Sequence, residues 1–163
     1  MANLCVLIDT NVWIDNYIPV RQGSALSREF IATAKKHQVQ LVYPVHVLKD
    51  VFYNLGATLK YIHRSEQDDL SEADALAIQE IVWSCIDNMS SLAIAVGTDE
   101  SDAWKARKYR SFSSDLEDNF VMVAAERVHA SFVVTRDELL LQKSTVPAYT
   151  PEEALGHLAV ELP

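Results

Sequence analysis

Short apolar runs of strand length alternate with amphipathic stretches of helix length along the whole chain. The strand-like segments are 4–8, 39–43, 92–96, 132–135 and 146–149. The helix-like segments are 24–37, 45–62, 72–89, 99–110, 114–130 and a last helix that begins at Thr150–Pro151. Strands that are separated by helices usually pair in parallel, with helices on both faces of the sheet. The alternation therefore predicts an α/β fold with a central, mostly parallel sheet.

Polar residues mark the expected starts of three helices. Ser71 is a candidate N-cap for 72–89, and Ser114 with Glu117 has the spacing of a capping box. Thr150 and Glu153 have the same spacing around a first-turn proline. Pro147 in the last strand-like segment predicts an edge strand, because proline cannot donate to a sheet ladder.

The composition is that of one ordered domain spanning residues 1–163. Of these residues 49% are hydrophobic, and the chain has only 4 glycines and 5 prolines, without a linker or repeat. No apolar run approaches the roughly 20 residues of a membrane helix, and no secretory signal is present. Cys5 and Cys85 are far apart and in apolar company, which indicates buried reduced thiols. We expect a cytoplasmic protein.

The net charge of −9 excludes one class of function. A protein that coats nucleic acid through electrostatics alone is usually basic, because contacts to phosphates supply that affinity. An enzyme whose acids hold divalent cations is not excluded, since the bound metal reverses the local charge that a phosphate meets. An acidic surface also suits a basic protein partner.

Isolated acids stand where the edges of such a sheet would meet. Asp9 follows the run Leu4–Ile8, Asp50 lies in the helix after the second strand, and Asp137 follows the strand 132–135. Asp115 and Asp118 share the start of one helix. Ligands bind at the carboxyl ends of strands in open α/β sheets, so these acids are candidates for a metal site with oxygen ligands.

Asn11 lies two residues after Asp9, and a strand through both would point their side chains to the same side. A simpler alternative is that Asn11 only shapes a turn. Asp115 and Glu117 have a simple alternative too, because an acid at a helix start is stabilised by the helix dipole. Asp50 could be an exposed acid paired with a nearby lysine. The five histidines show no recognisable metal spacing and are interpreted as structural or surface residues: His37, His46, His63, His129 and His157.

Four motifs in this order resemble the PIN-domain family, which includes the VapC-type toxins of bacterial toxin–antitoxin pairs. They are Leu7-Ile8-Asp9-Thr10-Asn11-Val12, an acid in the second helix, the run from Asp118 to Ala125, and Val133-Val134-Thr135-Arg136-Asp137. The similarity extends from about Leu4 to Leu155 and covers nearly the whole chain.

The resemblance implies a three-layer α/β/α sandwich and a metal-dependent ribonuclease. It matches Asp9, Asp50, Asp118 and Asp137 to the four acids of the family, although the second acid there is usually glutamate. Asp9, Asp118 and Asp137 would hold Mg²⁺ or Mn²⁺, with Asp50 completing the cluster. The metal would activate water for in-line attack on an RNA phosphodiester. Asn11, Asp115 and Thr135 would support these acids.

The densest basic stretch lies just ahead of Asp115. Lys105, Arg107, Lys108 and Arg110 surround Tyr109, and we expect them to hold RNA phosphates beside the acids. A solvated face of a short helix is the alternative. The resemblance also implies an antitoxin partner and a homodimer, in which Trp83 and Trp104 could serve an interface or the core. No membrane partner is expected.

Two other functions remain open. A phosphatase could use Asp9 as its nucleophile, but that chemistry normally needs a second aspartate two residues later, where this chain has Asn11. The chain could also be a PIN-like scaffold that binds a protein partner without catalysis. The complete set of acids argues against the scaffold, and Asp50 in place of glutamate argues for it.

Overall fold

The computed structural model describes residues 4–67 and 69–161. The strands are β1 (Cys5–Ile8), β2 (Gln40–Pro44), β3 (Ile94–Val96), β4 (Phe132–Val134) and β5 (Ala148–Tyr149). The helices are α1 (Thr10–Tyr17), α2 (Ser24–Lys36), α3 (Val45–Gln67), α4 (Glu72–Leu92), α5 (Glu100–Lys108), α6 (Leu116–Arg127), α7 (Glu138–Lys143) and α8 (Pro151–Glu161), with a 3-10 turn η1 (Tyr109–Ser111) after α5.

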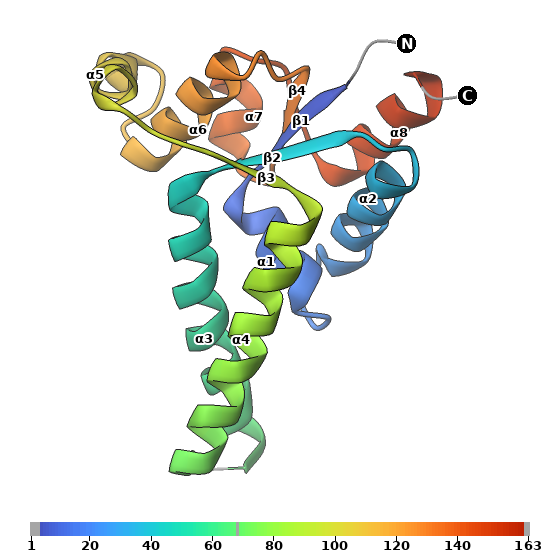
Figure 1. Cartoon of the computed structure of the whole chain (residues 1–163), viewed down its shortest axis with the longest axis vertical. Helices are drawn as coiled ribbons and strands as arrows, with labels where there is room; N and C mark the ends of the chain where they lie inside the picture. Colours follow the sequence, from blue (N-terminus) through green and yellow to red (C-terminus); the bar gives the residue numbers. More distant parts are fainter. Residues whose placement is uncertain (1–3, 68, 162–163) are drawn as a thin grey trace.

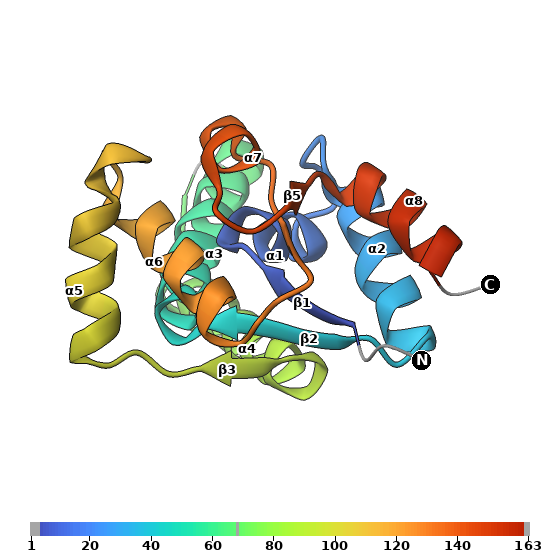
Figure 2. The same cartoon turned by 90° about the horizontal axis from the view of Figure 1, so that it is seen from above.

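The strands form one sheet in the order β3-β2-β1-β4-β5. Figure 2 shows β3, β2 and β1 side by side. All the pairs between described strands are parallel, with Leu7 opposite Val42 on one side and Val133 on the other. The chain moves outward from β1 to β3, then returns to the other side of β1 for β4 and β5. The predicted parallel α/β architecture is confirmed. The last strand β5 lies at the edge of the sheet as expected, with Pro147 directly before it.

The sheet is buried on both faces, because successive residues of a strand point to opposite sides. Val6 and Ile8 pack in one core with apolar residues of α1, α2, α3, α4 and α8. Leu7 packs in a second core with α6 and with Leu140 of α7. These two layers of helices with the sheet between them make a three-layer sandwich.

Helices α3 and α4 pack side by side and extend away from the sheet as a long hairpin (Figure 1). Ser71 caps α4 through a capping box with Asp74, as predicted. The predicted apolar stripe of α4 is buried against the rest of the fold, with Ile78, Val82 and Met89 at its centre. None of the described helices has both the length and the apolar composition that a membrane crossing requires.

The structure corrects several boundaries. Residues 10–17 and 138–143 are helices that the pattern did not predict, because each is short and follows a strand after one to three residues. Helix α3 continues to Gln67, five residues beyond the predicted end at 62.

Two local interpretations were also wrong. Helix α6 begins at Leu116 with Asp115 as its N-cap, and Ser114 does not cap it. Asp9 and Asn11 are not on one strand, because Asp9 is the N-cap of α1 and Asn11 lies in its first turn. By contrast, Thr150 and Glu153 form the predicted capping pair of α8. Both cysteines are free thiols as predicted, but they are half-buried and not fully buried.

Candidate functional site

Several helices begin at the edge of the sheet where β1, β2 and β4 end. Helix α1 starts directly after β1, α3 directly after β2, and α7 a few residues after β4. Asp9 caps α1 and Asp137 caps α7, where the carboxylate of Asp137 accepts hydrogen bonds from the N–H groups of Leu139 and Leu140. Free N–H groups and helix dipoles favour negative charge at this edge.

Asp9 is the buried centre of the site, with 5% of its surface exposed. Its Oδ1 accepts a hydrogen bond from the Thr10 N–H at 2.7 Å. Its Oδ2 accepts from Asn11 Nδ2 at 2.8 Å and from Thr135 Oγ1 at 2.7 Å. Thr135 also accepts from the N–H of Asp137 at 3.0 Å, so one hydroxyl links two acids. These bonds fix the orientation of the Asp9 carboxylate.

Burial and like charges act together on the acids of this edge. Burial raises the pKa of Asp9 to about 6, hydrogen bonds from Thr135 and Thr10 oppose that rise, and the charges of Asp118 and Asp137 add to it. The pKa of Asp118 is raised by burial and by the charges of Asp137 and Asp115. The charges of Asp118 and Asp137 thus act on Asp9, and a cation bound among these carboxylates would reduce that repulsion.

The start of α6 carries the remaining acids of the site. Asp118 accepts a hydrogen bond from Ser113 Oγ at 2.9 Å, and Ser113 is itself buried. Asp115 accepts from the N–H of Glu117, which is the ordinary role of an N-cap. Asn119 binds the Ser113 carbonyl at 3.0 Å and holds the preceding loop against the helix.

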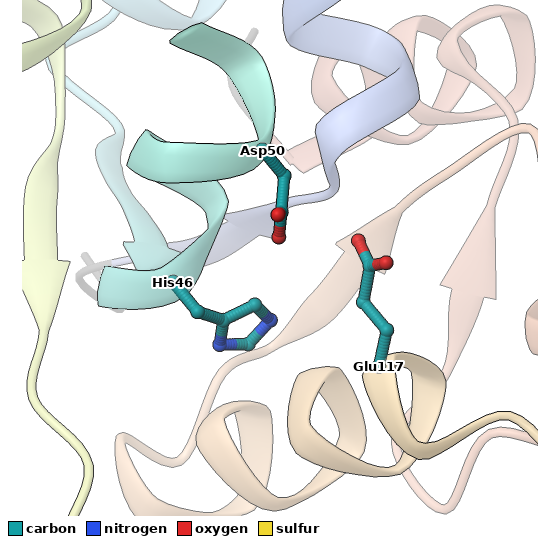
Figure 3. Close-up of side chains that lie close together, drawn as sticks. All are labelled: His46, Asp50 and Glu117. Carbon is teal, nitrogen blue, oxygen red and sulfur yellow. The ribbon is translucent and has the colours of Figure 1, made fainter. Parts of the chain in front are cut away.

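Sequence reasoning missed two residues that the structure places beside Asp50. His46, Asp50 and Glu117 each offer a ligand atom, and these atoms lie within 4.8 Å of one another (Figure 3). Glu117 accepts a hydrogen bond from Thr10 Oγ1 at 3.2 Å. Burial raises the pKa of Glu117, and the charges of Asp50 and Asp9 add to the rise.

The interpretation of His46 as a structural or surface residue is therefore too narrow. Its ring packs against Phe120 with centroids 5.7 Å apart, and burial lowers its pKa. Asp50 does have a lysine neighbour, with Lys49 Nζ 3.5 Å from Oδ1, but Lys49 is mostly exposed. The i, i+4 spacing of His46 and Asp50 at a helix start was the available sequence signal.

A buried ion-pair group holds the segment after β4 against α1, next to the site. Asp15 of α1 is fully buried and binds Arg21 Nε at 2.5 Å and Arg136 Nη1 at 2.6 Å. The backbone N–H of Arg136 also donates to Asn11 Oδ1 at 3.0 Å. Arg136 thereby holds the segment between Thr135 and Asp137 against α1.

The basic residues of 105–110 have different surroundings. Lys105 forms an ion pair with Glu126, and the ammonium of Lys108 lies 5.0 Å from the centre of the Trp104 ring. Arg107 and Arg110 form no ion pair with any described residue. Both line a pocket of about 340 Å³, which Asn119 of α6 also lines.

The donor set fits a hard divalent cation. Asp9, Asp118 and Asp137 offer carboxylate oxygens, and the energetic cost of holding these charges together falls when a cation is bound. Such a site can offset charge on a phosphate and supply an activated water. The geometry is thus suited to hydrolysis of a phosphoester.

Comparisons with known proteins agree with the fold. The family profile of the PIN domain matches residues 5–139. Among solved structures, the fold is similar to a chain in the crystal structure of VapBC2 from Rickettsia felis bound to a DNA fragment from their promoter. The TM-score is 0.61 at 12% identity, and the match covers 90% of this chain and 98% of that chain. No characterised protein sequence matches the chain.

Proposed function

Because the chain belongs to the PIN-domain family, we propose that it is a divalent-metal-dependent endoribonuclease that uses Asp9, Asp118 and Asp137. The observation that carries the proposal is the buried Asp9 carboxylate, which is fixed by three hydrogen bonds and whose pKa is raised by burial and by the charges of two further acids. Holding a carboxylate at 5% exposure beside two like charges costs stability, and a bound cation would offset that cost.

Each residue has a part in this proposal. Asp9, Asp118 and Asp137 would hold Mg²⁺ or Mn²⁺, and Asp50 would complete the cluster. When bound, the cation supplies charge stabilisation for the phosphodiester and lowers the pKa of a water molecule. Asn11 and Thr135 orient Asp9 through their hydrogen bonds, and Asp115 acts only through the start of α6.

RNA contacts are assigned first to Arg107 and Arg110. Their guanidinium groups are free of ion pairs with described residues and line a pocket that reaches Asn119, next to Asp118. A guanidinium binds phosphate oxygens in a bidentate manner, which positions the backbone of a nucleic acid. Lys105 and Lys108 would add charge to the same surface, although Glu126 and Trp104 already occupy them.

The test is RNA cleavage by the purified chain with Mg²⁺, with Mn²⁺ and with EDTA. Structured and single-stranded RNA are both offered. Asp118→Asn should lower the rate at least about 100-fold without loss of folding, because it removes one ligand charge and keeps the oxygen that accepts from Ser113. Asp87→Asn, at an exposed position of α4, is the matched control and should cleave normally.

Metal-independent cleavage, or full activity in Asp118→Asn, would refute the proposal. A folded chain that cleaves none of these RNAs with either metal would favour the alternative of a partner-binding scaffold. Circular dichroism spectra of each variant establish that the comparison is made between folded proteins.

We further propose that the chain acts as the toxin of a type II pair and binds an antitoxin protein. The similar structure from Rickettsia felis is that of VapBC2 bound to a DNA fragment from their promoter. Large apolar side chains stay exposed on α3 and α4, among them Tyr53 at 67%, Leu76 at 59% and Trp83 at 48%. Light scattering on the chain alone tests the homodimer, and co-expression with the product of the adjacent gene tests the antitoxin.

A further inference from the structure

The first turns of α3 and α6 bring a mixed set of ligand groups together at the rim of the acidic site. His46 and Asp50 are one helical turn apart on α3, so their side chains share a face. Glu117 approaches them from α6, and the imidazole edge and both carboxylates point toward a common space (Figure 3). His46 and Glu117 are 71 positions apart in the sequence and come together only in the folded chain.

A second observation at this place points to a ligand. The Nε2 atom of His46 is buried, and no group in the described part of the chain forms a hydrogen bond with it. Buried ring nitrogens normally have a partner, and an orphaned one costs stability. A metal ion is a common partner of a neutral imidazole nitrogen.

The contacts around His46, Asp50 and Glu117 leave their ligand atoms free to bind an ion. Glu117 Oε1 accepts from Thr10 Oγ1 at 3.2 Å, which orients the carboxylate, and its other oxygen has no hydrogen bond to a described residue. Phe120 packs against the imidazole and limits its rotation. Lys49 is 70% exposed, so its ammonium group can move away from Asp50 at little cost.

The dimensions suit a single ion. Two ligand atoms at about 2.1 Å from one metal are at most about 4.2 Å apart. The three ligand atoms lie within 4.8 Å of one another, so small side-chain rotations close the set around an ion. Two carboxylates and one neutral imidazole carry the charge that offsets a divalent cation.

We propose that His46, Asp50 and Glu117 form a second cation position that binds transition-metal ions such as Mn²⁺ or Zn²⁺ in preference to Mg²⁺. Imidazole nitrogen is a good ligand for transition metals, whereas Mg²⁺ takes oxygen ligands and keeps several waters. The role of this position in cleavage rests on the proposed nuclease function, because Asp50 would serve both cation positions. His46 would then determine how the activity of the chain differs from one metal to another.

The direct test is electron spin-echo spectroscopy of the full chain loaded with Mn²⁺, which detects ¹⁴N bound to the metal. The unaltered chain should show a ¹⁴N modulation that disappears in His46→Gln and persists in His37→Gln, an exposed position at the end of α2. The same modulation should persist in Asp118→Asn. Labelling histidine with ¹⁵N should change the pattern in the unaltered chain, a readout that needs no variant to fold.

Mn²⁺ affinity gives a second readout. Isothermal titration should show Mn²⁺ affinity at this position at least tenfold lower in Glu117→Gln, with Mg²⁺ affinity little changed. No ¹⁴N modulation in the Mn²⁺-loaded chain, its survival in a folded His46→Gln, or no Mn²⁺ binding at all would overturn the proposal. If the chain cleaves RNA but shows no ¹⁴N modulation, only the proposed second cation position is refuted. If the modulation is present but RNA is not cleaved, only the proposed nuclease function is refuted.

Discussion

Gly23 lies where two side chains of the buried ion-pair group meet. A Cβ added there would lie 2.2 Å from Arg136 Nη1 and 2.3 Å from Asp15 Oδ2, closer than any real contact. The backbone of Gly23, with φ of −85°, suits alanine equally well. The requirement for glycine is therefore space for the guanidinium, because Arg136 would have to leave Asp15.

Gly23→Ala should lower the free energy of unfolding by about 1 to 2 kcal/mol, as expected when extra volume displaces a packed group. Urea denaturation measures the loss. Gly156→Ala is the control, because a Cβ at that exposed position of α8 meets nothing within 4 Å. The control should gain about 0.5 to 1 kcal/mol from helix propensity. Equal effects at the two positions would refute the role of Arg136.

Single residues also show the limit of sequence reasoning at the site. Asp9 and Asp137 could be predicted together, because each follows a strand and parallel strand ends share one edge. The supporting roles of Asn11 and Thr135 were implied by the family resemblance. His46 and Glu117 could not be assigned in that way. Glu117 has a sufficient explanation in the helix dipole, and the partner of His46 becomes visible only when α3 and α6 are packed.

Glu126 of α6 is one of the acids that link α5 to α6. Its carboxylate binds Lys105, Thr145 and the Tyr109 hydroxyl, the last at 2.7 and 2.9 Å. Burial would raise the pKa of Glu126, but the hydrogen bonds from Lys105, Thr145 and Tyr109 outweigh burial and hold that pKa below its usual range. The folded chain thus stabilises the charged form of Glu126 more than the unfolded chain does.

Glu126→Gln should cost about 1 kcal/mol of stability at pH 7, since the group is partly exposed and solvent screens its charge. A lowered pKa in the folded state gives stability above the unfolded value of 4.5 that is lost as the pH falls below it. Urea curves for the variant and the unaltered chain should therefore differ by a constant amount above about pH 5 and converge as the pH falls below 4.5. A difference that stays constant below pH 4.5 would contradict this, and Glu29→Gln, at an exposed position of α2, is the control.

At the level of elements, periodicity predicted the strands and the long helices within a few residues. It failed for α1 and α7, of 8 and 6 residues, because such short helices contain too few turns to show a period. The predicted end of α3 was wrong for another reason. The end of the α3–α4 hairpin projects away from the sheet, so its residues need no apolar stripe toward the main core (Figure 1).

The whole chain carries a net charge of −9, and the carboxylate of Asp9 is buried. A divalent cation that binds only the folded state should stabilise it by about 2.7 kcal/mol at 100 times Kd, or roughly 5 to 10 °C in Tm. Differential scanning fluorimetry with Mn²⁺ should show this rise in the unaltered chain and little of it in Asp118→Asn. The same rise in KCl of matched ionic strength would mean simple screening.

The interpretation of residues 1–163 as one domain makes a prediction for the molecule as a unit. Single-tryptophan variants can report on three regions, with Trp13 in the core, Trp83 on the α3–α4 hairpin and Trp104 on α5. All three should give one unfolding midpoint in urea, equal to that from circular dichroism. An earlier midpoint at Trp83 alone would mean that the hairpin unfolds separately.

The central pairing of β1 with β4 has a consequence for how the protein is made. Thr135 Oγ1 binds Asp9 Oδ2, although the two residues are 126 positions apart in the chain. The amino-terminal part leaves the ribosome first, so a growing chain has Asp9 long before it has Thr135 or Asp137. On the proposed function, a nascent chain cannot cut the RNA around it until its last strands are made. Translation itself thus delays the onset of activity.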